Sequence, residues 1–221
     1  MRATFNPDIF AAGSLEAAKK IILTTEAPDA VAEWRWQAET PYLADLIIDR
    51  LHLHCDYTLL DYGCGIGRLA KQLIERCGCS VVGVDTSESM RALSAGYVSS
   101  DRFVVCAPEM LVQLAHRGLR LNGAIAVWVL QHCLTPGEDV ALIQFCLERN
   151  GELFVVNNKT RALPTREYGG WIDDGMDVKE IVSRKFTHIR EGQLDPVHVS
   201  QTVSNFSFWA QYRLFDATPP A

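Results

Sequence analysis

From Thr58 onward the sequence alternates short apolar runs with longer segments of helical periodicity. The runs are rich in Val, Ile, Leu and Phe and do not alternate apolar with polar residues, which is typical of strands buried on both faces of a parallel sheet. The five runs are Thr58–Asp61, Ser80–Asp85, Phe103–Cys106, Gly123–Val129 and Glu152–Val156. Because parallel strands are joined by right-handed helical crossovers, the pattern predicts an α/β fold with a doubly wound sheet and helices on both faces.

Four segments between these runs are predicted to be helices: Arg68–Arg76, Ser89–Ser94, Glu109–Arg117 and Glu138–Arg149. The last has the clearest boundary signals. Thr135 is expected to cap it, Pro136 to occupy the first helical position, and Glu138 to complete a capping box. Asn150-Gly151 is expected to end it.

The N-terminal region differs from this centre. Residues 14–53 are predicted to be helical, with Ser14-Leu15-Glu16 opening one helix, Pro28-Asp29 interrupting, and Pro41–Leu53 forming another. We therefore expect a single domain with an N-terminal helical cap or lid over residues 1–53 and a core over residues 54–216.

The C-terminal region begins with a polar loop after Asn157. Val178–Phe186 is predicted to be a helix, and Thr187–Arg190 and Ser204–Leu214 are predicted to be two further strands joined by a proline-containing connection. The tail Ala217–Ala221 is expected to be frayed.

Composition limits the class of protein. With 48% hydrophobic and 22% charged residues, the 221-residue chain is typical of a globular protein. Its net charge of -6 provides no general attraction to nucleic acid or to an anionic membrane.

There is no run of signal-peptide or membrane-spanning character, and the seven cysteines are odd in number without a C-x-x-C pair. We expect a cytoplasmic protein with reduced thiols. Neither Cys77-Gly78-Cys79 nor His52-Leu53-His54-Cys55 has zinc-site spacing, so no metal is expected.

The stretch T-L-L-D-Y-G-C-G-I-G-R, residues 58–68, places Gly63, Gly65 and Gly67 directly after an apolar run. A glycine-rich turn before a helix usually binds phosphate, and a dinucleotide fold has the spacing G-x-G-x-x-G. Here the spacing differs, and the carboxylate of Asp61 would repel a pyrophosphate and attract a cation.

A second acidic residue, Asp85, ends the next run eighteen residues beyond Gly67. An acidic side chain at this position is placed to accept hydrogen bonds from the hydroxyls of a ribose. A ligand that combines a ribose with a positive group and has no pyrophosphate is S-adenosylmethionine (SAM).

Four stretches in this order resemble the class I SAM-dependent methyltransferases: L-L-D-Y-G-C-G-I-G-R-L-A, V-V-G-V-D-T-S-E-S-M, A-I-A-V-W-V-L-Q-H and G-E-L-F-V-V-N-N. The match spans about Thr58 to Asn158. The resemblance implies a seven-stranded, mostly parallel sheet with an antiparallel last strand. It also implies that the ligand lies across the carboxyl ends of the first strands.

The resemblance also implies roles for individual residues. Asp61 would engage the methionine ammonium, the three glycines would pass under the methionine, and Asp85 would hold the ribose. Thr86 follows Asp85, and Met90 would pack against adenine. The third strand ends in Cys106-Ala107-Pro108-Glu109, where the family often has Gly-Asp-Ala, so the adenine contact would fall to Ala107 or to Glu109.

The slot after the fourth strand, V-W-V-L-Q-H-C, resembles that of methyltransferases acting on small molecules. It lacks the Asp or Asn with Pro-Pro and an aromatic residue that is usual for base amines, and the Pro-Cys pair of cytosine C5 chemistry, so no nucleic-acid substrate is expected. Trp128 would line the methyl site. His132 is a candidate general base because the ordinary pKa of histidine lies near working pH, and the alternative is that it only orients the loop.

Two further segments are candidates for the site. Arg35, in Trp34-Arg35-Trp36, would pair with the methionine carboxylate, or the two tryptophans anchor the cap. The loop Tyr168–Asp174 lies at the predicted functional edge, where Asp173 and Asp174 would position an acceptor or form a solvated turn.

These inferences predict a methyltransferase that transfers the methyl group of SAM to oxygen or nitrogen of a small molecule. Two alternatives stay open at this point: an aminopropyl transferase on the same fold, and a non-catalytic SAM-binding or regulatory protein.

Overall fold

The computed structural model describes residues 4–23, 31–167 and 170–215. Its centre is a seven-stranded sheet with the strand order β3-β2-β1-β4-β5-β9-β8. These strands are β1 (Thr58–Tyr62), β2 (Ser80–Val84), β3 (Phe103–Cys106), β4 (Leu121–Val127), β5 (Leu147–Asn158), β8 (Phe186–Gly192) and β9 (Ser207–Leu214). β1 to β5 pair in parallel, and β9 pairs antiparallel with both β5 and β8. The predicted doubly wound sheet with an antiparallel last strand is confirmed.

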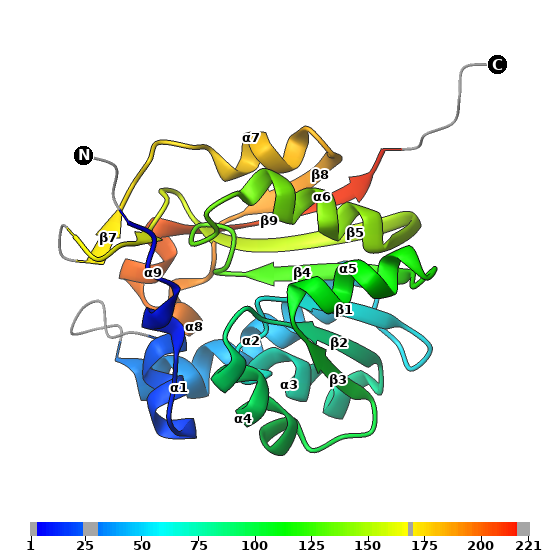
Figure 1. The fold of residues 1–221 in the computed structure, drawn as a ribbon, viewed down its shortest axis with the longest axis horizontal. Coiled ribbons are helices and arrows are strands. Elements are labelled where there is room, and N and C mark those ends of the chain that lie inside the picture. The colour runs from blue at the N-terminus through cyan, green and yellow to red at the C-terminus, as the bar shows by residue number, and fades with distance from the viewer. Residues whose placement is uncertain (1–3, 24–30, 168–169, 216–221) are drawn as a thin grey trace.

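Helices cover both faces of the sheet (Figure 1). They are the 3-10 helix η1 (Pro7–Phe10) and the α-helices α1 (Leu15–Ile22), α2 (Ala32–Leu51), α3 (Arg68–Cys77), α4 (Glu88–Val98), α5 (Pro108–His116), α6 (Pro136–Cys146), α7 (Val178–Ser183), α8 (Pro196–Val199) and α9 (Gln201–Phe206). Leu59 and Leu60 of β1 are both fully buried and belong to different cores. Leu59 packs in the core of α2 and α3, and Leu60 in the core of α5 and α6. Successive strand residues point to opposite faces, which explains why these runs are apolar throughout.

The N-terminal segment, residues 4–23, crosses the end of the sheet toward which β4 points (Figure 1). On one side, the backbone N–H of Asn6 donates to the carbonyl of Pro164 at 2.9 Å, in the small hairpin of β6 (Leu163–Pro164) and β7 (Trp171–Ile172). On the other side, the hydroxyl of Ser87 donates to the carbonyl of Phe10 at 3.0 Å, at the start of α4. The segment therefore joins two elements that lie about 80 residues apart in the sequence.

The second N-terminal helix is longer than predicted. The predicted start at Pro41 is wrong, because α2 begins at Ala32 and contains Pro41 within it. An internal proline costs a helix about 3 kcal/mol. Trp36 precedes Pro41, Leu43 and Ile47 follow it, and all three are buried. We infer that burial of this long face outweighs the cost of the proline. The predicted cap of α1 is confirmed, since the Ser14 hydroxyl accepts from the N–H of Ala17.

The predicted boundaries of α6 are partly wrong. The helix begins at Pro136 as expected, but the Thr135 side chain makes no capping hydrogen bond, and the helix ends at Cys146 instead of Arg149. Leu147 already pairs with Leu121 of β4, which buries its side chain in the sheet. Asn150, with φ 67°, and the following glycine therefore lie within an irregular part of β5 and do not form a helix stop.

Two C-terminal boundaries also differ. Phe186 lies in β8, where its side chain is buried, and α7 ends at Ser183. Residues 204–206 belong to α9, and the proline-containing connection forms α8. The predictions for Pro28-Asp29, for Tyr168 and for the tail from Ala217 fall outside the described residues.

Two findings concern the whole described chain. All seven cysteines are among the described residues, and all are free thiols. Within residues 4–23, 31–167 and 170–215, no helix has the length and apolarity needed to cross a membrane.

The two ends of α3 provide a stability prediction. Gly67 and Gly78 flank this helix with φ 79° and 69°, a region that costs other residues about 1–2 kcal/mol. A Cβ on Gly67 would lie 2.4 Å from Cγ2 of the buried Val98, whereas a Cβ on Gly78 would lie 3.5 Å from its nearest neighbour, Cys55. We expect Gly78→Ala to lower the free energy of unfolding by about 1 kcal/mol, and Gly67→Ala by about 3 kcal/mol.

Urea denaturation of both variants measures this difference, with Gly78→Ala as the control for the backbone conformation alone. Equal losses in the two variants would contradict the steric argument.

Candidate active site

The glycine loop, residues 63–67, connects β1 to α3 and turns sharply at the carboxyl end of the sheet. Its three glycines all have positive φ, at 75°, 54° and 79°. A Cβ on Gly63 would lie 2.2 Å from Cγ2 of Val129, which follows β4. The loop is thus packed against the end of β4 so closely that only glycine fits at residue 63.

Asp85 holds this loop in place. One carboxylate oxygen accepts from the N–H of Gly65 at 2.8 Å, and the other accepts from the N–H of Ser87 at 2.8 Å. Burial raises the pKa of Asp85, and these two hydrogen bonds act in the opposite direction. A carboxylate oxygen has two lone pairs, so each oxygen retains one for a ligand hydroxyl.

Asp61, at the end of β1, is 4% exposed, and its Oδ2 atom has no hydrogen-bond partner within the described chain. Burial, together with the nearby charge of Asp85, raises the pKa of Asp61 to about 7. A buried carboxylate without a partner is costly unless a positive group reaches it.

A group of buried charges lies beside Asp61. Glu39 of α2 is fully buried and accepts from Nε of Arg35 at 2.6 Å, and its other oxygen lies 3.5 Å from Nη2 of Arg68. The Nη1 atom of Arg68 is buried and has no partner among the described residues. The guanidinium of Arg35 also lies 5.5 Å from the ring centre of Trp128. We call Arg35, Glu39 and Arg68 the charge cluster.

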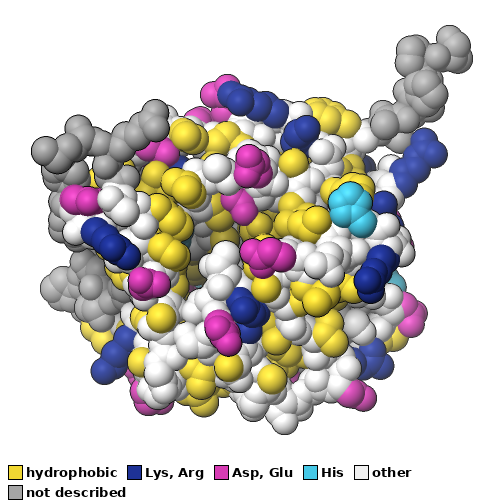
Figure 2. Space-filling model, viewed as in Figure 1, with side chains coloured by type: hydrophobic (Ala, Val, Ile, Leu, Met, Phe, Trp, Pro, Cys, Tyr) yellow, Lys and Arg dark blue, Asp and Glu magenta, His cyan; other side chains and the backbone are white. Residues whose placement is uncertain are grey.

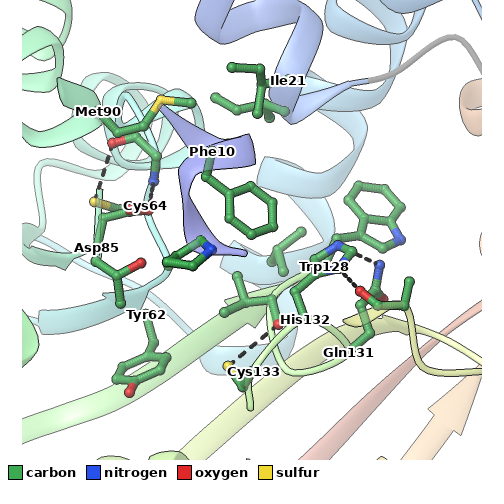
Figure 3. A pocket seen from close by; sticks show the side chains of 18 of the residues that line it. Phe10, Ile21, Tyr62, Cys64, Asp85, Met90, Trp128, Gln131, His132 and Cys133 are labelled. Atoms are coloured by element: carbon green, nitrogen blue, oxygen red, sulfur yellow. Dashed lines mark hydrogen bonds between the residues drawn. The ribbon is translucent and has the colours of Figure 1, made fainter. Parts of the chain in front are cut away.

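One cavity of about 850 Å³, within the ~300–1,000 Å³ range of ligand pockets, is lined by Arg35, Asp61, Arg68 and Asp85, with Glu39 behind the two arginines. The cavity brings together nine of the residues predicted from the sequence: Arg35, Asp61, Gly63, Gly65, Asp85, Thr86, Met90, Trp128 and His132. Gly67 and Ala107 are not among its lining residues. Figure 3 shows Phe10 of η1 projecting into its centre, with Met90 and Asp85 on one side and Trp128 and His132 on the other.

The region expected to contact adenine has an apolar wall. Met90 is 2% exposed and lines the cavity, as does Pro108. Ala107 caps α5, where its carbonyl accepts from the N–H groups of Met110 and Leu111. Glu109 is exposed and is not among the lining residues.

The turn after β4 positions His132. Trp128 has φ 52°, which is rare for a residue with a large side chain and turns the chain out of the strand. The Nδ1–H of His132 donates to the carbonyl of Ala162 at 2.6 Å, and its Nε2 lies 3.1 Å from Nε2 of Gln131. Because the Gln131 oxygen accepts from the N–H of Asn158, its amide nitrogen faces the histidine. Burial lowers the pKa of His132, so the ring is neutral with Nε2 as the acceptor.

The two aspartates of the loop before α7 lie elsewhere. Asp174 binds Nε and Nη2 of the buried Arg161, both at 3.1 Å, and Asp173 accepts from the N–H of Gly175. Neither aspartate lines the cavity, whereas Trp171 of the same loop does.

Sequence reasoning missed Arg68, Phe10 and the pair Tyr62–Asp139, which all line the cavity. The Tyr62 hydroxyl donates to Asp139 at 2.5 Å. One signal for Arg68 was present in the sequence: helix N-termini favour acidic side chains, and this arginine begins α3 without an acidic residue in the first turn. Phe10 had no such signal.

A family model described as a methyltransferase domain matches residues 26–190, and the chain belongs to this family. The predicted class, a SAM-dependent methyltransferase, is therefore confirmed. No curated protein sequence matches the chain. Within the described residues, no group of three or more His, Cys, Asp or Glu side chains is arranged to hold a metal ion.

Solved structures share the fold at low sequence identity. The cyclase SpnF is 17% identical, with a TM-score of 0.61 over 79% of this chain and 81% of that chain. The N-methyltransferase NodS from Bradyrhizobium japonicum WM9, in complex with S-adenosyl-L-homocysteine (SAH), is 14% identical, with a TM-score of 0.59 over 86% and 94%. The magnesium protoporphyrin IX methyltransferase ChlM from Synechocystis PCC 6803, with bound SAH, is 15% identical, with a TM-score of 0.59 over 93% and 91%.

The raised pKa of Asp61 predicts that the free energy of unfolding depends on pH. The pKa of Asp61 is about 7 in the folded protein and ~3.9 in an unfolded chain, so between these values the folded state binds more protons. The free energy of unfolding therefore falls as pH rises from about 4 and levels off above about 7. We expect Asp61→Asn to raise the free energy of unfolding at pH 8 by roughly 4 kcal/mol and to lose this advantage toward pH 4.

Urea denaturation at pH 5 and pH 8 measures the effect, with the exposed Asp101→Asn as the matched control. A variant that is less stable than the natural protein at pH 8 would show that Asp61 has a partner in solution.

Proposed function

We propose that the cavity binds SAM and that the protein transfers its methyl group to oxygen or nitrogen of a small molecule. The observation that carries the proposal is a pair of buried atoms, Oδ2 of Asp61 and Nη1 of Arg68, which have no partner among the described residues and whose side chains line the same cavity. One is an acceptor and the other a charged donor. An α-amino acid group, with its ammonium and carboxylate, satisfies both.

The remaining parts of the cofactor fit the residues beside this pair. The glycine loop lets the backbone approach the methionine chain, the free lone pairs of Asp85 accept from the ribose hydroxyls, and Met90 offers an apolar surface to adenine. When bound, SAM supplies an electrophilic methyl group. SAH in the structures of NodS and ChlM supports this assignment for a chain of the same fold.

The charge cluster favours SAM over its decarboxylated form. Glu39 binds Nη2 of Arg68, whereas the buried Nη1 of Arg68 has no partner among the described residues. The carboxylate of SAM would accept a hydrogen bond from this atom, and the decarboxylated cofactor of an aminopropyl transferase would not.

The N-terminal segment is proposed to act as the lid of the site. Phe10 and its neighbours cross the cavity mouth, and the backbone bonds of the segment hold it there. Methyl transfer is an in-line displacement that gains rate from alignment and from exclusion of water. A closed lid serves both.

A small molecule suits the site better than nucleic acid. On the face shown in Figure 2, acidic and basic side chains are interspersed, and the chain as a whole carries a net charge of -6. Seven free cysteines suit a reducing compartment, and we propose that the protein acts in the cytoplasm.

Calorimetric titration with SAM, SAH and NAD tests the cofactor assignment. We expect SAM and SAH to bind, and Asp61→Asn to weaken SAH binding about 10- to 100-fold, because a charge-assisted hydrogen bond is lost. Ionised Asp61 is required, so the affinity of the natural protein is expected to fall as pH drops below about 7. The variant is expected to lack this pH dependence.

Asp45→Asn, a change at an exposed residue of α2 that does not line the cavity, is the matched control and should bind SAH normally. Titration with decarboxylated SAM separates the aminopropyl alternative. A folded protein that binds NAD and neither SAM nor SAH would overturn the proposal.

His132 is proposed as the general base for an acceptor hydroxyl. Its Nδ1–H is fixed on Ala162, which directs the lone pair of Nε2 toward the Gln131 amide within the cavity wall. An acceptor hydroxyl would replace this amide at Nε2. Because burial holds the pKa of His132 below its ordinary value, the base is available at neutral pH.

With an acceptor identified by screening, His132→Asn is expected to lower turnover about 100-fold or more without changing the dissociation constant of SAH. At saturating SAM, the pH–rate profile of the natural protein should fall only below ~6.5, the ordinary pKa of histidine. Unchanged turnover in the variant would leave His132 with the orienting role alone.

A further inference from the structure

Part of the cavity lies beyond the groups that the cofactor would use. Three aromatic rings form a continuous wall there, which we call the aromatic wall: Phe10, His132 and Trp171. The ring centres of Phe10 and His132 are 5.5 Å apart, those of His132 and Trp171 5.2 Å, and those of Phe10 and Trp171 6.1 Å. The rings meet at tilted or edge-to-face angles, which is the geometry that aromatic side chains prefer.

One hairpin supports all three rings. Trp171 lies in β7, His132 binds the carbonyl of Ala162 immediately before β6, and the segment bearing Phe10 binds Pro164 of β6 through Asn6. A backbone bridge between Phe5 and Thr165 extends this connection. The wall is therefore a built feature of the fold, assembled from three distant parts of the sequence.

The wall selects by shape more than by charge. The charged side chain behind it, Arg161, is buried and already paired with both oxygens of Asp174. Both ring nitrogens of His132 are hydrogen-bonded. Trp171 remains 38% exposed, so an indole surface stays available to a molecule entering the cavity.

We propose that the methyl acceptor is an aromatic molecule, a phenol or an arylamine, whose ring packs on Phe10 and Trp171. This inference rests on the function proposed above and names its substrate class. Packing on the wall places the acceptor hydroxyl beside His132 and toward Trp128, on the cofactor side. For a phenol, an oxygen lone pair forms the new O–C bond and the C–S bond breaks with its electrons on sulfur. The hydroxyl proton passes to Nε2 of His132.

The test compares 2-naphthol with its saturated counterpart, decahydro-2-naphthol, as probes. Each is titrated calorimetrically into protein saturated with SAH, and methyl transfer from radiolabelled SAM is measured with both. We expect 2-naphthol to bind about tenfold more tightly, because each aromatic pair adds to the affinity that burial alone provides. We expect methylated product from 2-naphthol only.

Two variants test whether the aromatic wall causes the preference for 2-naphthol. Trp171→Leu and Phe10→Leu are each expected to bring the two dissociation constants within about twofold of each other. SAH binding is expected to stay unchanged in Trp171→Leu, because Trp171 lies away from the groups assigned to the cofactor. Trp34→Leu is the matched control, because Trp34 is similarly exposed, at 41%, and does not line the cavity. It should keep the tenfold preference.

The inference would be overturned by equal binding of the two probes, by stronger binding of the saturated probe, or by a preference that survives in Trp171→Leu. Binding of SAH without binding of either probe would also overturn the inference and leave the cofactor assignment intact. Absence of SAH binding by the folded natural protein would instead contradict the proposed function itself.

Discussion

The buried carboxylate of Glu39 is the interaction on which the site depends. It binds Arg35 of its own helix and Arg68, the first residue of α3, and so ties the N-terminal helix to the glycine loop. Arg35 in turn lies over Trp128 at the end of β4. Charges buried in this way are costly unless they are paired, so the three elements can close around the cavity only with Glu39 between the arginines.

The same region contains features that lower the stability of the folded protein and that selection for folding alone would not retain. Asp61 and Arg68 each bury a polar atom that finds no partner in the part of the chain that the structure describes, and Trp128 has a positive φ. Asp85, by contrast, accepts a backbone N–H with one lone pair of each carboxylate oxygen, and these hydrogen bonds shape the glycine loop. Unpaired buried atoms and backbone strain of this kind are common at functional sites. A ligand that forms hydrogen bonds with the unpaired atoms removes their desolvation cost, and this makes the free energy of binding more favourable.

Phe10 divides the cavity into two chemically different halves. The half with Asp61, Asp85 and the two arginines Arg35 and Arg68 is polar and charged, and it suits a cofactor that carries a charged amino acid and a ribose. The half with His132 and Trp171 is aromatic, and both ring nitrogens of His132 are hydrogen-bonded. One fold supports many reactions, as the cyclase of similar fold illustrates, so we propose that this second half determines the choice of acceptor.

Patterns in the sequence alone specify the sheet and one side of the site. Strands buried on both faces must be apolar throughout, which made the five runs visible, and the carboxyl ends of parallel strands meet at one edge, which brought Asp61 and Asp85 together. Local signals failed where tertiary contacts outweighed them, as at Pro41 within α2 and at Leu147, which joins the sheet instead of continuing α6. Only the tertiary structure decided the partnership of Glu39 with Arg68 and the aromatic wall. Their residues lie on segments far apart in the chain, and no periodicity or spacing encodes a contact that exists only after the helices and the hairpin have packed against the sheet.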